Sequence, residues 1–119
     1  MKTNIALALT AAAFAFTAQA AQDPIPDIIF VPENAQVIDA EQKRRGGFEL
    51  EADISGGSLD GLSEEVKAFY HERGFELRRD RADADDVELV FVKEQDNIEV
   101  DIELEHNDII EYSVDYEPR

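Results

Sequence analysis

The sequence predicts an α+β fold in which one helix packs on one face of a mainly antiparallel sheet, in the order β-α-β-β-β-β. Apolar and polar residues alternate through residues 48–54, 98–104 and 110–116, a period typical of half-buried strands. Residues 59–70 instead place apolar side chains at helical spacing. One strand, one helix and then four strands indicate a small sheet with the helix on one face.

Residues 1–20 have the three features of a secretory signal peptide. Lys2 supplies the positive charge, and the apolar run over residues 5–16 is too short to cross a bilayer. Ala18 and Ala20 are the small residues that a signal peptidase reads, so cleavage is expected after Ala20. The alternative is an uncleaved anchor or a buried helix. The sequence therefore predicts a periplasmic or secreted protein, and the absence of cysteine excludes lipoprotein processing.

The composition is strongly acidic. The 119 residues contain 28 acids and 11 bases, a net charge of −17. Without Lys2 the expected mature chain keeps 10 of the 11 bases and all 28 acids, a net charge of −18. Such a charge argues against nucleic acid or an anionic membrane as partner, and it favours a cation or a basic protein. No segment beyond residue 20 is long and apolar enough to predict a membrane span, and the length fits one domain.

Residues 21–47 are expected to form an extended N-terminal arm ahead of the domain at residues 48–119. Prolines disfavour helix at the start of the arm. We expect residues 28–31 to pack as a short edge strand, with Val37 and Ile38 making a second contact. The prolines are Pro24, Pro26 and Pro32.

The helix is bounded by recognisable end signals. Ser58 is suited to cap its N-terminus, although Asp60 or Ser63 are alternatives. Gly74 is suited to the position after its C-terminus. The apolar stripe is formed by Leu59, Leu62, Val66, Phe69 and Tyr70.

Strands are expected to return after the helix. We predict strands around residues 75–78 and 87–93, separated by a polar loop at residues 80–86. Val90 and Val92 lie on the face of their strand opposite Leu89, and either a dimer contact or the proline-containing arm is expected to cover them.

The last hairpin can be placed in register. A turn at residues 106–108 pairs Leu104 with Ile110 and brings the other apolar residues together on one face, whereas a two-residue turn would mix the faces. On the other face this register sets Glu103 against Glu111 and Glu99 against Asp115. Like charges directly opposite one another cost stability, so these pairs are unusual.

These carboxylates form a predicted acidic interaction face. Its members are Glu99, Asp101, Glu103, Glu111 and Asp115, with Glu49, Glu51 and Asp53 as further candidates. One interpretation is a docking surface for a cation or a basic protein. The other is a solvated face that keeps the domain soluble and discourages edge pairing.

No pattern of residues predicts catalysis, a metal site or a cofactor. The acidic loop at residues 80–86 lacks the glycine and the distant glutamate of a calcium loop. His71 and His106 are far apart in sequence, and neither has a second histidine at ligand spacing. Ser55 and Ser58 flank two glycines without forming a nucleophile elbow. The sequence therefore predicts a protein that is not an enzyme.

Several of these residues resemble a pattern found in small exported bacterial proteins and lipoproteins of unknown function. In that pattern a strand leads to a helix ending in Phe-Tyr, then Gly-aromatic, then a β-meander. Here the matching residues are Phe48, Leu50, Phe69–Tyr70 and Gly74–Phe75, with Pro32, Ala35 and Val37 in the lead-in. This chain departs from the pattern in having Phe75 in place of tryptophan, in lacking the lipoprotein cysteine and in being more acidic. The resemblance implies fold and export, and it carries no functional residues.

The leading functional hypothesis is a non-catalytic binding or interaction module with an unidentified basic partner. A divalent-cation-responsive periplasmic protein is the first alternative. The second is an inhibitor module of the PepSY type, to which the chain has a weaker similarity that its first strand fits poorly. The sequence leaves the oligomeric state open.

Overall fold

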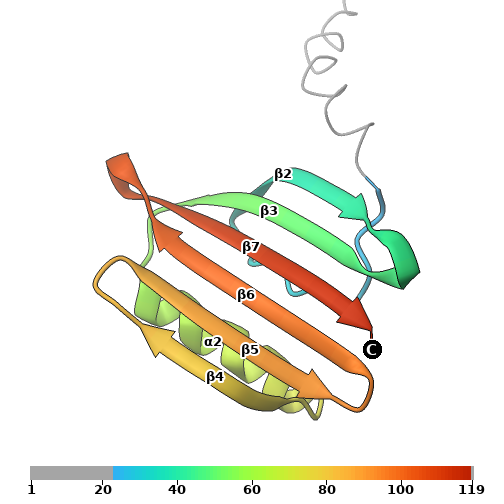
Figure 1. The fold of residues 1–119 in the computed structure, drawn as a ribbon. Helices are drawn as coiled ribbons and strands as arrows, with labels where there is room; N and C mark the ends of the chain where they lie inside the picture. Colours follow the sequence, from blue (N-terminus) through green and yellow to red (C-terminus); the bar gives the residue numbers. More distant parts are fainter. Residues whose placement is uncertain (1–22, 119) are drawn as a thin grey trace, which may run out of the picture.

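The computed structural model describes residues 23–118, so the predicted signal peptide and its cleavage site after Ala20 lie outside the described residues. The described chain folds into one antiparallel sheet with one long helix (Figure 1). The elements are β2 (Ala35–Gln42), η1 (Arg44–Gly46), β3 (Phe48–Ser55), α2 (Leu59–Glu72), β4 (Glu76–Ala82), β5 (Asp86–Lys93), β6 (Asp96–Leu104), η2 (His106–Asp108) and β7 (Ile109–Pro118).

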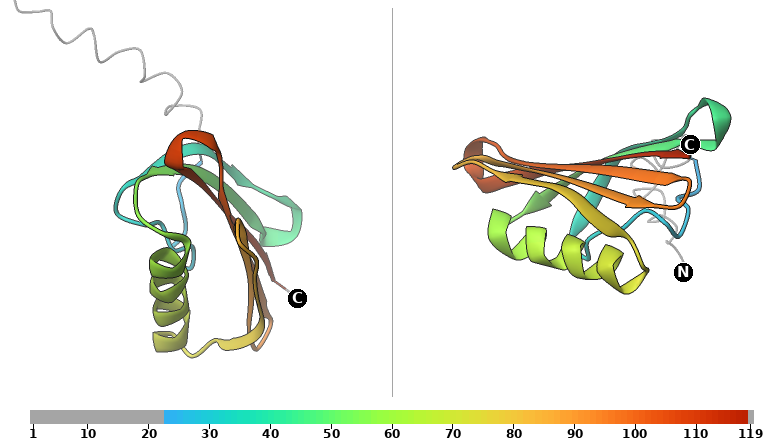
Figure 2. Two further views of the ribbon diagram at one scale, coloured as in Figure 1. Left: turned by 90° about the vertical axis from the view of Figure 1, so that its left-hand side faces the viewer. Right: turned by 60° about the horizontal axis from the view of Figure 1, so that its bottom comes forward.

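The six strands have the order β2-β3-β7-β6-β5-β4, and every neighbouring pair is antiparallel. Helix α2 covers one side of the sheet and leaves the other side open (Figure 2). The predicted α+β class, with one helix on one face of an antiparallel sheet, is confirmed. From Phe48 onward the elements follow the predicted order β-α-β-β-β-β.

The core lies between the sheet and α2, and the alternation of the strands builds it. In β3 every second residue is buried, beginning with Phe48 and Leu50, and the residues between them are exposed or half-buried. The same pattern runs through β5, β6 and β7. The helix contributes Leu62, Val66 and Tyr70. This burial of apolar area is the main term that stabilises the fold.

Both ends of α2 use the residues that the sequence predicts. The Ser58 hydroxyl accepts a hydrogen bond from the Gly61 N–H at 3.0 Å, so Ser58 is the N-cap. At the C-terminus Gly74 has a φ of 85°, and the Phe75 N–H donates to the Tyr70 carbonyl at 3.0 Å. These are features of a Schellman motif, which favours glycine in the left-handed conformation.

The register of the last hairpin is confirmed. Leu104 lies opposite Ile110, Glu103 opposite Glu111 and Glu99 opposite Asp115. The turn at its tip is η2, in which Asn107 has a φ of 64°. The two predicted like-charge pairs are therefore neighbours across β6 and β7.

The structure corrects the prediction for the arm. Residues 28–31 are not a strand, whereas Ala35–Gln42 form the edge strand β2, which pairs with β3. The backbone of residues 28–30 forms hydrogen bonds with the side chains of two buried tyrosines, and not with the backbone of a neighbouring strand. The Tyr70 hydroxyl donates to the Ile28 carbonyl at 2.8 Å and accepts from the Phe30 N–H at 3.1 Å. The Tyr112 hydroxyl donates to the Phe30 carbonyl at 2.6 Å.

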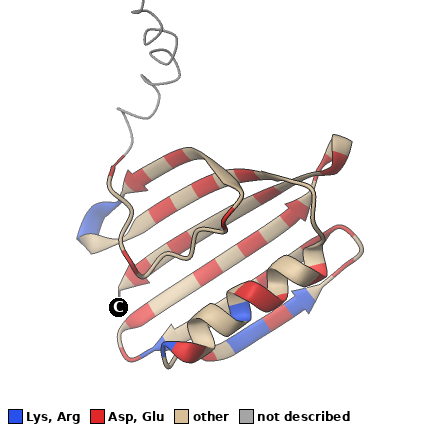
Figure 3. Ribbon diagram, turned by 180° about the vertical axis from the view of Figure 1, so that it is seen from behind, with Lys and Arg blue, Asp and Glu red and all other residues tan. Residues whose placement is uncertain are grey.

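This arm packs on the same side of the sheet as α2 (Figure 3). The Ile29 side chain is buried in the core, and the Phe30 ring lies 4.8 Å from the Phe69 ring, between centroids. Of the two alternatives for Val90 and Val92, cover by the arm is therefore wrong, because these valines face the opposite side. The loop predicted at residues 80–86 is also shorter than expected, since β4 continues through Ala82.

Candidate docking face on the open side of the sheet

The open face is the side of the sheet away from α2, and carboxylates cross it in rows. One row runs from β2 to β6 through Glu41, Glu49, Asp115 and Glu99. A second row contains Asp39, Glu51, Ser113, Asp101 and Glu88, and a third contains Asp53, Glu111, Glu103 and Asp86. Alternation brings these side chains to one face, because the residues between them point into the core.

The structure brings all five predicted members of the acidic face together on β6 and β7. Glu99, Asp101 and Glu103 are alternate residues of β6, and Glu111 and Asp115 lie opposite them on β7. The three further candidates of β3, which are Glu49, Glu51 and Asp53, continue the same face on the far side of β7.

Sequence reasoning missed the members on β2 and β5. Asp39 and Glu41 belong to β2, which was not predicted as a strand. Asp86 and Glu88 belong to β5, where Glu88 lies opposite Asp101. The alternation within residues 87–93 could have identified Glu88 as a member of the open face, because it places this residue on the face opposite Leu89.

Burial and mutual repulsion disfavour ionisation along β6. Partial burial raises the pKa of Glu99, and a hydrogen bond with Glu88 and repulsion from Asp101 raise this pKa further. Partial burial, then repulsion from Glu88, also raises the pKa of Asp101. These shifts follow from carboxylates that share one face at strand spacing.

The same effect appears towards the tip of the last hairpin. Repulsion from Glu105 is the main cause that raises the pKa of Glu103. Partial burial, followed by repulsion from Glu105, raises the pKa of Glu111. A positive charge placed near these groups is favoured, because it would offset their repulsion.

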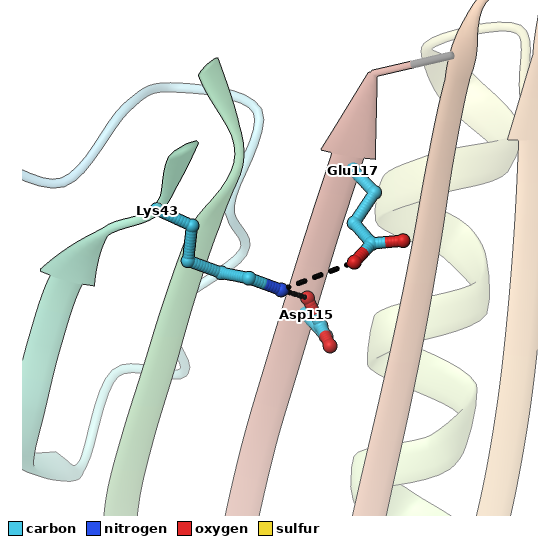
Figure 4. A network of polar contacts seen from close by, with 3 residues as sticks. All are labelled: Lys43, Asp115 and Glu117. Atoms are coloured by element: carbon cyan, nitrogen blue, oxygen red, sulfur yellow. Dashed lines mark hydrogen bonds and ion pairs between the residues drawn. The ribbon is translucent and has the colours of Figure 1, made fainter. Parts of the chain in front are cut away.

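The bases near this face lie at its margins. Lys43, which follows β2, pairs through Nζ with the Asp115 carboxylate at 2.5 Å and the Glu117 carboxylate at 3.2 Å (Figure 4). The hydrogen bond with Asp115 is the main cause that raises the pKa of Lys43. At the other margin Arg79 and Arg81 of β4 pair with Glu88 at 3.6 and 3.3 Å.

Between these margins the carboxylates have no positive partner. Within residues 23–118, no lysine or arginine forms an ion pair with Glu99, Asp101, Glu103 or Glu111. The centre of the face is therefore a region of uncompensated negative charge.

Two groups of three carboxylates come close together on this face. One is formed by Glu88, Glu99 and Asp101, and the other by Glu103, Glu105 and Glu111. In each group one carboxylate oxygen per residue lies within 4.8 Å of the others. Oxygen ligands of this type suit hard cations such as calcium.

The other sequence candidates lie away from this face. His71 is exposed near the end of α2, and His106 is exposed in η2. Neither histidine belongs to a carboxylate group that could hold a metal among residues 23–118. Ser58 caps α2, as the sequence predicts, and Ser55 is the last residue of β3.

Comparison with known proteins gave no relative for this chain: no protein family model, curated protein or solved structure matches it. The resemblances described above therefore stay predictions. Among residues 23–118, α2 is neither long nor apolar enough to cross a membrane, and no other helix meets that requirement.

Proposed function

We propose that the chain is an exported, non-catalytic binding domain whose open sheet face docks a positively charged protein or peptide. The observation that carries this proposal is the unneutralised centre of the open face, where aligned rows of carboxylates cross β3, β7, β6 and β5. Charge complementarity of this kind guides encounter and fixes orientation.

The energetics of the face support a role beyond solubility. Acids scattered over the surface would keep the domain soluble without cross-strand repulsion. Here Glu103 lies opposite Glu111 and Glu99 opposite Asp115, and each arrangement destabilises the free protein. A basic partner would relieve that repulsion on binding, so part of the binding free energy would come from the domain itself.

Charge-reversed variants test the proposal. The purified protein is titrated with a fluorescent oligolysine peptide and used as bait in a periplasmic extract. The double variant Glu103→Lys/Glu111→Lys should lose oligolysine affinity by about tenfold or more, which corresponds to about 1.4 kcal/mol. It should also capture less of any specific partner.

The matched control is Glu65→Lys/Glu72→Lys, which changes the net charge equally on exposed positions of α2. This control should bind as the unaltered protein does. Equal weakening of both variants would show that total charge governs binding, and the docking face would then be rejected.

A divalent cation is the second candidate ligand, favoured by the two three-carboxylate groups. Calorimetric titration with calcium or magnesium chloride, at constant ionic strength set with sodium chloride, measures it. Specific binding should give heat that Glu99→Gln/Asp101→Asn reduces and Glu65→Gln/Glu72→Gln does not. Heat no larger than ionic screening produces would end this hypothesis.

A further inference from the structure

We propose a second interaction surface, at the β4 edge of the sheet, that takes an extended acidic peptide as an added strand. This surface lies apart from the centre of the open acidic face, so this proposal can be correct or wrong independently of the function proposed above. The sheet ends at β4, and alternate residues of an end strand direct their N–H and C=O groups away from the sheet. All seven residues of β4 are exposed.

The two edges of the sheet differ in what covers them. At β2 the arm occupies part of the edge, since the Asp23 N–H donates to the Ala40 carbonyl at 3.0 Å and the Gln42 N–H donates to the Asp23 carboxylate at 2.8 Å. Among residues 23–118, no backbone–backbone hydrogen bond other than the β4–β5 pairing reaches β4. The β4 edge is thus the one with backbone groups available to a ligand strand.

A cavity of about 320 Å³ with an apolar sheet side lies beside this edge, between β4 and α2. Leu77, Phe75 and Phe91 line its sheet side and make it apolar, whereas the helix side is lined by Glu64, Lys67, Ala68 and His71. The Leu77 side chain is 40% exposed. A strand added next to β4 would direct every second side chain towards α2, so apolar ligand residues would enter this cavity.

The other side of the same edge is basic. A bulge after Leu77 shifts the register, so that Leu77 lies opposite the buried Phe91 while Arg79 lies opposite Val90 of the open face. Arg81 follows on the same face, opposite Glu88. The lysines and arginines of the described chain gather mainly here and at η1 (Figure 3).

These arginines can exchange their partners for those of a ligand. The side chains of Arg79 and Arg81 are 54% and 69% exposed, and both pair with the single carboxylate of Glu88. Exposed ion pairs contribute little stability, so replacing them costs little. Strand β4 itself carries three arginines against Glu76 and Asp80, and these two acids pair with Arg78 and Lys67 at 3.2 and 2.8 Å. Acids of the far strands, beyond about 8 Å, are largely screened at about 0.15 M salt.

The ligand chemistry follows from the two sides of the edge. The fitting peptide is extended and alternates apolar side chains, directed towards α2, with acidic side chains, directed towards the arginines. Backbone hydrogen bonds would supply affinity, and the alternation would supply specificity.

Fluorescence anisotropy of the purified protein with a labelled, capped octapeptide of alternating valine and glutamate tests this inference. The peptide should bind, and Leu77→Glu should weaken binding about tenfold or more by placing a charge at the cavity. Arg79→Glu/Arg81→Glu, which leaves the apolar side intact, should weaken binding to a similar degree. Ile38→Glu alters the 52% exposed residue of the opposite edge strand and should have no effect.

Two altered peptides complete the test. Replacing glutamate with lysine should give a peptide whose remaining binding, at the open acidic face, no longer depends on Leu77→Glu. Methylating alternate backbone nitrogens on the β4-facing side of the valine–glutamate peptide should weaken its binding about tenfold. The inference is overturned if the valine–glutamate peptide fails to bind, if the methylated peptide binds equally, or if Ile38→Glu weakens binding as much as Leu77→Glu. Sedimentation showing that a second copy of the chain fills this edge would overturn it as well.

Discussion

Removing one hydroxyl group by Tyr70→Phe should loosen the N-terminal arm and destabilise the whole domain. The hydroxyl donates to the Ile28 carbonyl and accepts from the Phe30 N–H, at 2.8 and 3.1 Å. The substitution keeps the ring, which lies 4.8 Å from the Phe91 ring between centroids, so apolar packing is preserved. The loss is therefore confined to two hydrogen bonds.

The expected cost is about 2 kcal/mol, because an unsatisfied buried polar group costs about 1–3 kcal/mol and the arm is only partly buried. With a urea dependence of about 1–2 kcal/mol per molar for a domain of this size, the unfolding midpoint should fall by about 1–2 M. Urea unfolding followed by circular dichroism measures this shift.

Tyr116→Phe is the matched control, because the Tyr116 hydroxyl donates to the Asp96 side chain, which water can solvate in its place. This control should cost about 0.5 kcal/mol. Equal unfolding midpoints for Tyr70→Phe and Tyr116→Phe would refute the reasoning that the tyrosine hydroxyl holds the arm.

Three further outcomes are expected. The folded-state pKa values of Glu99, Asp101, Glu103 and Glu111 lie above the ordinary 4.5 for Glu and 3.8 for Asp, so the folded state binds more protons. Protonation of these four carboxyl groups should therefore stabilise the folded state as pH falls through their raised pKa values. This stabilisation should be complete below the ordinary pKa values and be lost again as pH rises. Calorimetric melting from pH 7 to pH 4 measures it, and a melting temperature that does not change with pH would contradict it. Sodium chloride should raise the melting temperature at pH 7 by screening the same repulsion, and Glu103→Gln/Glu111→Gln should reduce that salt dependence. Gly74→Ala should cost about 1 kcal/mol in urea unfolding, because Gly74 has a φ of 85°; an unchanged midpoint would exclude this conformational cost.

The parts of the fold that were predictable are those fixed by neighbours in sequence. The hairpin of β6 and β7 could be placed in register because one turn length matches apolar residues on one face. Ser58 and Gly74 mark the ends of α2 for similarly local reasons. Local pattern therefore sufficed for the helix and for the strands on which the five predicted acidic residues lie.

The parts that were not predictable depend on distant residues or on broken periodicity. Strand β2 contains a register shift between Val37 and Asp39. This shift interrupts the alternation of apolar and polar residues, so the sequence pattern does not reveal the strand. The path of the arm is set by Tyr70 and Tyr112, which are 42 and 82 residues away from the carbonyls they bond. Lys43 likewise meets Asp115 across 72 residues, so the margin of the acidic face could not be read from local sequence.

The place of β7 in the sheet has a consequence for the unity of the fold. Strand β7, Ile109–Pro118, lies between β3 and β6 and is the only strand that joins them in the order of the described sheet. Without it the β2–β3 pair and the strands β4, β5 and β6 share no hydrogen-bonded ladder, so the six-stranded sheet depends on contacts of long sequence separation. Detachment of β7 would divide the sheet in two and leave the facing edges of β3 and β6 open to other strands.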